Sequence, residues 1–289
     1  MSVVSTQLSS TLLRLQKNTN WYMPIHPFLK WPGGKRWLIK YHPELLPDQI
    51  EGRYIEPFLG SGSVYFHLRP KQAILSDLNK DLIDTYKSVR SKHVKLTNWL
   101  KVHDENHSPE YYYKIRSSSP VELSERAARF IYLNRTCFNG IYRVNSKGQF
   151  NVPIGTQTNV VLPTDSFKVW SKTLKQAELK HSDFETVINL AGEGDFLFVD
   201  PPYTVRHNLN GFIQYNEVLF SWEDQVRLSN AVNRARLRKV KILMTNANHE
   251  SIRTLYLDGF DQRVVTRYSS ISASVEGRNA FEELVITTN

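Results

Sequence analysis

The sequence RYIEPFLGSGS at residues 53–63 joins a short apolar run to a turn that contains two glycines. The run predicts a strand over Arg53–Ile55, and Ser63–Leu68 after the turn has the pattern of a helix. Ala73–Ser76 then predicts a second strand and Lys80–Arg90 a second helix. This order of strand, glycine turn, helix and strand indicates a parallel βαβ unit, and therefore an α/β fold.

The alternation of strands and helices continues on both sides of this unit. We predict strands at Phe196–Val199, Lys241–Thr245, Gln262–Val265 and Glu283–Thr287, and helices at Arg36–Leu46, Trp222–Arg238 and Ile252–Leu257. These elements form one predicted domain, made of residues 28–79 and 166–289. A polar extension over residues 1–27 precedes it.

Residues 80–165 interrupt this domain and have a different pattern. Glu122–Phe138 is helical, and the sequence Asn145-Ser146-Lys147-Gly148 predicts the turn of a β-hairpin. The insert contains 13 Lys and Arg against 8 Asp and Glu, a net charge of +5. The whole 289-residue chain has a net charge of +9, so the insert carries about half of it. A basic insert favours a polyanionic partner such as nucleic acid.

The overall composition excludes several classes of protein. Hydrophobic residues make up 40% and charged residues 22%, which is typical of globular domains and unlike disordered or fibrous chains. The single cysteine, Cys137, excludes a disulfide framework and a cysteine-based zinc site. No apolar run approaches the roughly 18 residues of a membrane span, and Met1–Asn20 lacks the pattern of a signal peptide. We therefore expect a cytoplasmic protein.

Asp200-Pro201-Pro202-Tyr203 directly follows the apolar strand Phe196–Val199. In α/β sheets, ligands bind at the carboxyl ends of the strands. The Asp200 carboxylate and the Pro201 carbonyl can each accept one hydrogen of an amino group on a planar ring. The prolines stiffen the backbone, and Tyr203 can stack on the ring. The alternative is a proline-rich strand exit with no ligand.

The glycine turn Glu56–Ser63 and Asp77 form a second candidate site. Two glycines allow a tight turn and close approach of the backbone to a ligand. Asp77 ends the second strand, where a carboxylate can accept the hydroxyls of a ribose. The alternative is a plain tight turn followed by a helix-capping aspartate.

Phe28-Leu29-Lys30-Trp31-Pro32-Gly33-Gly34-Lys35 is a third candidate. It lacks the spacing of a P-loop and has Arg36 where Ser or Thr should follow the lysine. It can instead surround an aromatic group and a carboxylate, or it is a surface turn before a helix.

Other patterns carry less information. His103 and His107 have the i, i+4 spacing of metal ligands, but no third ligand is evident. Ser61 and Ser63 have no nearby His and Asp that would make a nucleophile. Arg227–Lys241 contains six Lys and Arg and no acid, which suits either phosphate binding or the end of a helix dipole.

Taken together, these segments resemble the Dam-type DNA adenine methyltransferases, from about residue 28 to the end. The order is the alpha arrangement of that family: the Trp31–Lys35 segment, the glycine loop, Asp77, a basic insert, then Asp200–Tyr203. The resemblance also covers 133–143, 148–153 and 269–283. It implies a Rossmann-like S-adenosylmethionine-dependent methyltransferase sheet with an inserted, mostly helical target-recognition domain and a β-hairpin. It further implies S-adenosylmethionine as cofactor, with S-adenosylhomocysteine as product and no metal.

The resemblance assigns roles residue by residue. Catalytic residues would be Asp200, Pro201, Pro202 and Tyr203. Cofactor contacts would be Trp31, Lys35, Phe58, Gly60, Gly62, Asp77, Asp183, Phe184 and Asp200. DNA contacts would be Lys30, Phe138, Asn139, Ile141, Arg143 and Pro153.

The resemblance also implies the substrate, which is double-stranded DNA. The target would be an adenine within the sequence GATC that is flipped out of the duplex. Phe138 replaces a Tyr that is usual at its position, Ile141 replaces a Leu, and Pro32 replaces an Ala. We expect a monomer encoded by a bacterium or a phage. Three alternatives remain at this point: an RNA adenine methyltransferase, a non-catalytic DNA-binding relic, and a nucleotide-binding dehydrogenase that lacks the third glycine of its fingerprint.

Overall fold

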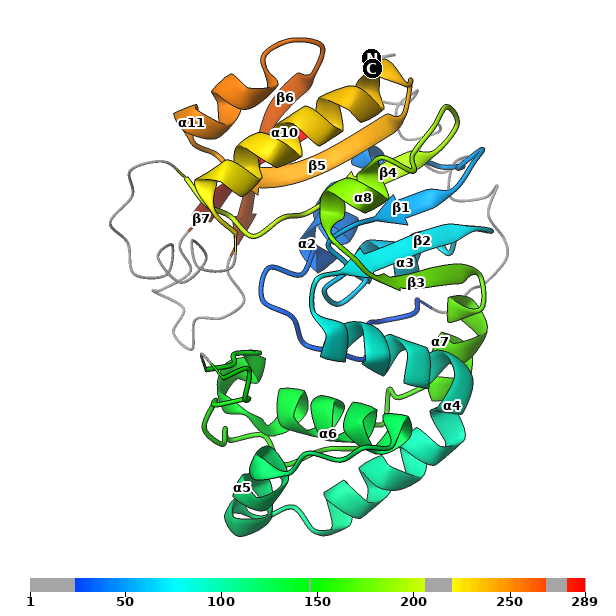
Figure 1. The fold of residues 1–289 in the computed structure, drawn as a ribbon, viewed down its shortest axis with the longest axis vertical. Helices are drawn as coiled ribbons and strands as arrows, with labels where there is room; N and C mark the ends of the chain where they lie inside the picture. The colour runs from blue at the N-terminus through cyan, green and yellow to red at the C-terminus, as the bar shows by residue number, and fades with distance from the viewer. Residues whose placement is uncertain (1–23, 146, 206–219, 269–279, 289) are drawn as a thin grey trace, which may run out of the picture.

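The centre of the molecule is a sheet of seven strands. The computed structural model describes residues 24–145, 147–205, 220–268 and 280–288. The strand order is β3-β2-β1-β4-β5-β7-β6 (Figure 1). Their bounds are β1 Tyr54–Glu56, β2 Ala73–Asp77, β3 Ala177–His181, β4 Phe196–Val199, β5 Lys241–Ala247, β6 Asp261–Tyr268 and β7 Ala280–Thr287. The first five run parallel, whereas β7 is antiparallel to both of its neighbours.

Helices cover both faces of this sheet, which explains why the four residues of the central strand β4 are all buried and apolar. Tyr54 and Ile55 are adjacent on β1, so they point to opposite faces, and each belongs to a different hydrophobic cluster. The Tyr54 side is covered by α2 (Arg36–Tyr41), α3 (Ser63–Leu68), α4 (Lys80–Glu105) and α7 (Phe167–Leu174); the Ile55 side is covered by α8 (Phe184–Ile188), α10 (Trp222–Leu237) and α11 (Glu250–Arg253). In Figure 1, α8 and α10 lie in front of the sheet and α2 and α3 lie behind it. The predicted Rossmann-like α/β sheet is therefore confirmed.

A helical part separates β2 from β3 in the chain. It contains most of α4, then α5 (Pro109–Ser117), α6 (Leu123–Thr136) and the 3-10 helix η2 (Phe138–Gly140), which lie below the sheet in Figure 1. The helix α4 is bent at Lys92, whose φ is −131°. Before the bend, the Arg90 guanidinium donates to the Ala177 carbonyl of β3. Because α4 belongs partly to the sheet and partly to the helical region, the domain limits at residues 80 and 165 stay a prediction.

The predicted hairpin is present as a short antiparallel pairing. Val144 bridges to Phe150, and the Asn145 N–H donates to the Gln149 carbonyl over 2.8 Å. The Asn145 side chain also accepts the N–H groups of Lys147 and Gln149. Ser146, the second residue of the predicted turn, lies outside the described residues.

Several predicted boundaries differ from the structure. The first helix was expected over Arg36–Leu46, but α2 ends at Tyr41. Residue His42 precedes a proline, a position that disfavours helical backbone, and a 3-10 helix η1 (Pro43–Leu45) follows. The helix expected at Ile252–Leu257 is α11 with a 3-10 helix η3 (Thr254–Tyr256).

The predicted extension at the start of the chain lies mostly outside the described residues. Of the predicted extension, residues 1–23 lie outside the described residues, while Ile25 packs on the core and the His26 carbonyl accepts from the Trp170 indole. Within the described ranges, no helix combines the length and apolarity needed to cross a membrane.

Candidate active site

Asp200 lies where the buried strand β4 ends, beside the end of β5. One of its carboxylate oxygens, Oδ1, is 2.9 Å from Lys35 Nζ and accepts a hydrogen bond from Thr245 Oγ1 over 2.8 Å. Neither contact uses Oδ2. Burial raises the pKa of Asp200, the Lys35 ammonium opposes this rise, and the nearby Glu283 carboxylate adds to it. The ion pair with Lys35 therefore stabilises the carboxylate in its charged form.

Tyr203 is held on the other side of Lys35 by Glu283, a residue that the sequence reading placed in a strand without a role. The Tyr203 hydroxyl donates to Glu283 Oε2 over 2.7 Å, and Lys35 Nζ is 3.6 Å from the same oxygen. Lys35 Nζ also lies 5.1 Å from the centre of the Tyr203 ring. Lys35, Asp200, Tyr203 and Glu283 thus form one cluster, in which Lys35 and Glu283 are buried and Asp200 and Tyr203 are half-buried.

Prolines 201 and 202 connect Asp200 to Tyr203 along the chain. Pro201 is buried, and the Pro202 carbonyl accepts from the Gln225 side chain of α10 over 3.4 Å. This contact anchors the tetrapeptide to the helix that covers the sheet.

The glycine loop forms the second part of the site. Gly60 and Gly62 have φ of +47° and +64°, a left-handed backbone that glycine adopts without strain. The Gly60 N–H donates to Asp77 Oδ2 over 3.1 Å, and the Asn79 N–H donates to Asp77 Oδ1 over 2.9 Å. A Cβ added at Gly60 would lie 2.8 Å from Trp31 Cδ1, so the Trp31 ring rests directly on the loop. The structure therefore brings Trp31, the loop and Asp77 together.

A buried carboxyl group lies beneath both parts of the site. Glu56 is the last residue of β1 and accepts a hydrogen bond from the Tyr54 hydroxyl over 2.9 Å. Burial raises the pKa of Glu56 well above its ordinary value, and the charges of Asp200 and Asp77 raise it further. Glu56 is the first residue of the glycine-turn motif, but the sequence did not predict that its side chain is buried.

Asp183 and Phe184 lie at the start of α8, next to the loop. The rings of Phe58 and Phe184 stack with their centres 5.4 Å apart. Asp183 caps α8 and accepts two hydrogen bonds from Arg227, over 2.8 and 2.9 Å, and the Arg227 guanidinium is 4.2 Å from the Phe184 ring centre.

The basic stretch Arg227–Lys241 is largely engaged within the domain. Arg234 forms an ion pair with Glu185, Lys239 with Glu193, and the Arg238 guanidinium donates to carbonyls of residues 188 and 191. Arg234 and Arg236 lie in the last turn of α10, where their charge suits the helix dipole, and phosphate binding by this stretch stays a prediction.

The six residues expected to contact DNA come together at the end of α6. The Asn134 side chain holds the backbone of Lys30 in both directions, over 2.9 and 2.8 Å, and also donates to the Gly140 carbonyl. The Phe138 N–H donates to the Pro153 carbonyl. The side chains of Lys30, Phe138, Asn139, Arg143 and Pro153 are exposed, and that of Ile141 is half-buried. The Phe138 side chain is 53% exposed.

One aromatic side chain connects this surface to the glycine loop. The Tyr142 ring stacks on Trp31 with the centres 5.8 Å apart, and it also contacts Phe130 of α6. Next to it, Arg143 Nε donates to Asn151 Oδ1 over 2.9 Å across the hairpin. Asn151 was quoted in the sequence without a role.

The weaker candidates form ordinary structural contacts. His103 and His107 are hydrogen-bonded to the hydroxyls of Tyr111 and Tyr132 respectively. The hydroxyls of Ser61 and Ser63 bond to each other over 2.9 Å. Among the residues that the structure describes, no group of three or more His, Cys, Asp and Glu could hold a metal ion.

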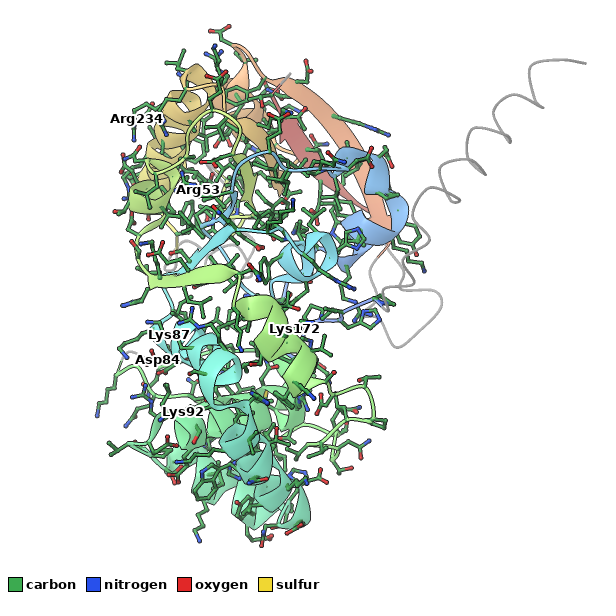
Figure 2. All side chains as sticks on the ribbon, turned by 90° about the vertical axis from the view of Figure 1, so that its right-hand side faces the viewer. Arg53, Asp84, Lys87, Lys92, Lys172 and Arg234 are labelled. Carbon is green, nitrogen blue, oxygen red and sulfur yellow. The ribbon has the colours of Figure 1, made fainter. Side chains whose placement is uncertain are left out.

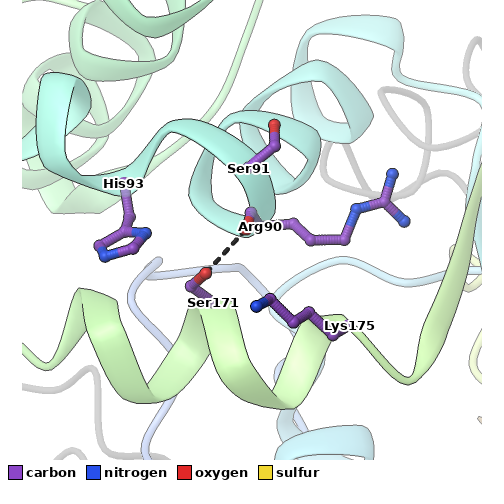
Figure 3. Close-up of a pocket in the computed structure, with 5 residues that line it drawn as sticks. All are labelled: Arg90, Ser91, His93, Ser171 and Lys175. Atoms are coloured by element: carbon purple, nitrogen blue, oxygen red, sulfur yellow. Dashed lines mark hydrogen bonds between the residues drawn. The ribbon is translucent and has the colours of Figure 1, made fainter.

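A shallow hollow of about 460 Å³ lies elsewhere, at the seam between α4 and α7 (Figure 3). Its lining is Arg90, Ser91, His93, Ser171 and Lys175, and none of the expected site residues is among them. Figure 2 shows further lysines of the same two helices, among them Lys87, Lys92 and Lys172. This region is basic, but it is separate from the Asp200 cluster.

Comparisons with known proteins show which proteins the chain resembles. A family model described as D12 class N6 adenine-specific DNA methyltransferase matches residues 31–271. The chain is 34% identical to the type II methyltransferase M1.LlaDCHI of Lactococcus lactis subsp. cremoris, over 94% of this chain and 98% of that relative. It is 34% identical to the type II methyltransferase M.MjaIII of Methanocaldococcus jannaschii, over 91% and 99% of the two chains. It is 31% identical to a DNA adenine methylase of Haemophilus influenzae, over 90% and 92%.

Proposed function

The chain belongs to the D12 class of N6 adenine-specific DNA methyltransferases, and from this premise we propose how its residues divide the work. Its reaction transfers a methyl group to the amino nitrogen of adenine in DNA, and the family uses S-adenosylmethionine as methyl donor. We assign the target adenine to Asp200, Pro201 and Tyr203, the donor to the glycine loop and Asp77, and DNA to the surface at the end of α6.

The residues of the loop suit a nucleoside with a free ribose. Asp77 presents both carboxylate oxygens at the end of β2, where the N–H groups of Gly60 and Asn79 donate to one oxygen each. Trp31 covers the loop, and Phe58 with Phe184 provides aromatic surface beside it. The bound donor supplies a methyl group that its sulfonium already activates.

The chain's own residues prepare the acceptor nitrogen. The adenine amino lone pair is delocalised into the ring, so the nitrogen is a poor nucleophile. One amino hydrogen donates to Asp200 Oδ2, since Oδ1 is used by Lys35 and Thr245, and the other donates to the Pro201 carbonyl. These bonds favour a tetrahedral nitrogen with its lone pair directed at the methyl group. The Asp200 charge then stabilises the positive charge that develops on the nitrogen.

The target base must leave the duplex to reach this cluster, because the amino group is inaccessible inside the helix. Tyr203 would stack on the flipped adenine, and Phe138 would fill the space that it leaves. The exposed aromatic ring of Phe138 on the DNA-facing surface supports this assignment.

The recognition sequence that we propose is GATC, with Arg143 reading a guanine and Lys30 a second base nearby. The support is the resemblance of residues 133–143 and 148–153 to the Dam-type family, together with the shared exposed surface of these residues. Single-molecule sequencing of DNA from a methylation-free host that expresses the chain reports both the modified base and the motif. Methylation at another motif would remove GATC from the proposal and leave the reaction unchanged.

The observation that carries the proposal is the Asp200 carboxylate, fixed through one oxygen at the end of β4. Asp200→Ala should lower kcat by about 10²–10³-fold, the effect of losing one preorganised electrostatic partner. The measurement is methyl transfer from labelled donor to duplex DNA, with circular dichroism to show that the fold is intact. Asp48→Ala, at an exposed position, is the control. A folded Asp200→Ala protein with activity within about threefold of the wild type would refute the mechanism.

A further inference from the structure

Glu283 is a buried acid that none of the assigned roles includes. It lies in the middle of β7, opposite Ala247 of β5 and Val265 of β6, and its side chain is 3% exposed. Burying a carboxylate is unfavourable unless partners compensate for the lost water. Two members of the Asp200 cluster contact it: the Tyr203 hydroxyl at 2.7 Å and the Lys35 ammonium at 3.6 Å.

These contacts restrain the Tyr203 ring. The hydroxyl oxygen lies on the axis of the Cβ–Cγ bond, so the bond to Glu283 fixes the direction of the ring axis. Because a phenol O–H prefers to lie in the plane of its ring, the direction of its acceptor also restrains the rotation of the ring about that axis. The 2.7 Å bond ends on a sheet strand rather than on a loop, and a strand is a rigid anchor. The orientation of the ring matters for the reaction if the target base stacks on its face. Tyr203 directly follows Asp200 and the two prolines, so it lies next to the proposed adenine site.

Lys35 connects the same acid to Asp200. Its Nζ donates to the Gly33 carbonyl over 2.7 Å and is 2.9 Å from Asp200 Oδ1, so the longer contact to Glu283 is an ion pair and the shorter ones are hydrogen bonds. Of the two contacts that Glu283 makes in the cluster, the bond to Tyr203 is the closer.

We propose that Glu283 is a positioning residue for methyl transfer, which holds the Tyr203 hydroxyl and thereby orients the ring that stacks on the target adenine. This inference rests on the proposed function. Glu283 acts through Tyr203 and does not touch the reacting atoms.

Three variants separate this role from a general structural one. Glu283→Leu fills the space but removes the acceptor, and Tyr203→Phe keeps the ring but removes the donor. Each should lower kcat by roughly 10- to 100-fold, the range for a lost hydrogen bond to a charged group, with KM for S-adenosylmethionine changed by less than about threefold. Glu283→Gln keeps an acceptor oxygen, so it should retain kcat within about threefold.

A double variant tests whether both residues act through the same bond. Tyr203→Phe with Glu283→Leu should be no more than about threefold slower than the slower single variant, because both changes remove the same bond between Tyr203 and Glu283. DNA with 2-aminopurine at the target position gives an independent readout. A flipped base that stacks on a fixed ring is quenched, so Glu283→Leu and Tyr203→Phe should brighten the complex and Glu283→Gln should not.

The outcomes are distinguishable from those of the proposed function. Glu282 is on the same strand but exposed, so Glu282→Gln should methylate DNA like the wild type. If neither the wild type nor Glu282→Gln methylates adenine in DNA, the proposed function is wrong, and the result says nothing about Glu283. The inference is overturned if Glu283→Leu is as active as the wild type, or if the two losses multiply in the double variant. If Glu283→Leu does not fold, Tyr203→Phe is sufficient as a test. The inference is then overturned if Tyr203→Phe has the kcat and the 2-aminopurine fluorescence of the wild type.

Discussion

Asp77 is the residue whose loss should affect the donor and nothing else. Its carboxylate is fixed by the N–H groups of Gly60 and Asn79, which leaves it aimed from the end of β2. Asp77→Ala should weaken S-adenosylmethionine binding by about 1.5–3 kcal/mol, as expected for hydrogen bonds to a charged group. Calorimetry measures this loss, and DNA affinity without donor should stay unchanged. Normal donor affinity in the variant would make Asp77 a purely structural residue.

Arg143 should read a base, because its guanidinium is already oriented. Asn151 accepts its Nε, and no other residue in the described ranges bonds it, so its two Nη groups can donate to the two major-groove acceptors of guanine. Arg143→Ala should weaken DNA binding by about 1–3 kcal/mol and reduce the selectivity for the base at one position. Asn151→Ala should reduce the selectivity at the same position by a smaller amount.

The alternative for Arg143 is a phosphate contact. The assay is methylation of a set of duplexes that vary one base pair at a time around the target adenine. If Arg143→Ala slows every duplex by the same factor, and the salt dependence falls by about one unit, then Arg143 binds a phosphate and reads no sequence.

At the scale of the element, the sequence predicted the strands that lie inside the sheet and missed one at its edge. β4 was predicted to the residue because all four of its side chains are buried and apolar. β3, Ala177–His181, was missed because it lies at the edge of the sheet and alternates apolar with charged residues over only five positions. The helix α4 was predicted only to Arg90, since the polar residues after the bend at Lys92 gain their helical structure from packing on α6.

The site was predicted in the same uneven way. Asp200, Asp77 and the glycines stand in local motifs, so the sequence could identify them. Glu283 and Asn151 owe their roles to partners 80 and 8 residues away, and only the fold brings these partners together.

The packing of α4, α5 and α6 should depend on pH through His103. This side chain is buried between Tyr111 and Tyr132, and burial lowers its pKa from 6.5 to about 4. Between these two pH values the unfolded chain binds a proton that the folded protein does not. Stability should therefore fall by about 3 kcal/mol as the pH drops from 6.5 to 4, and should not fall above 6.5.

Urea unfolding at a series of pH values measures this effect against His103→Asn. Other histidines are present in both proteins, so the difference between the two curves isolates His103. A variant with the same pH dependence as the wild type would show that His103 is not held neutral.

At the scale of the whole molecule, the +9 charge should act on DNA through one face. Arg143 and Lys147 are exposed on the hairpin. Lys172 is exposed on α7, and Lys175, which lines the hollow of Figure 3, is exposed at the end of that helix. Two double variants change the net charge equally. One combines Arg143→Glu with Lys147→Glu, and the other combines Lys172→Glu with Lys175→Glu. The first pair should weaken DNA binding by more than about tenfold at about 0.15 M salt and lower its salt dependence, and the second by less than about threefold.

Equal losses from the two pairs, measured by fluorescence anisotropy over a range of salt concentrations, would contradict this prediction. They would show that the summed field of the protein attracts DNA and that the hairpin makes no special contact.

The antiparallel strand β7 has a consequence for the order in which the molecule is made. It lies between β5 and β6, and β6 pairs only with β7 in the described sheet. A ribosome releases the chain from its N-terminal end, so β6 emerges with no strand to join and β5 with one edge bare. Bare strand edges invite pairing with other chains. The nascent protein is thus exposed to aggregation until residues 280–287 emerge. The same residues bring Glu283 to Tyr203, so the complete seven-stranded sheet and the Glu283–Tyr203 contact of the proposed active site both depend on the last strand to leave the ribosome.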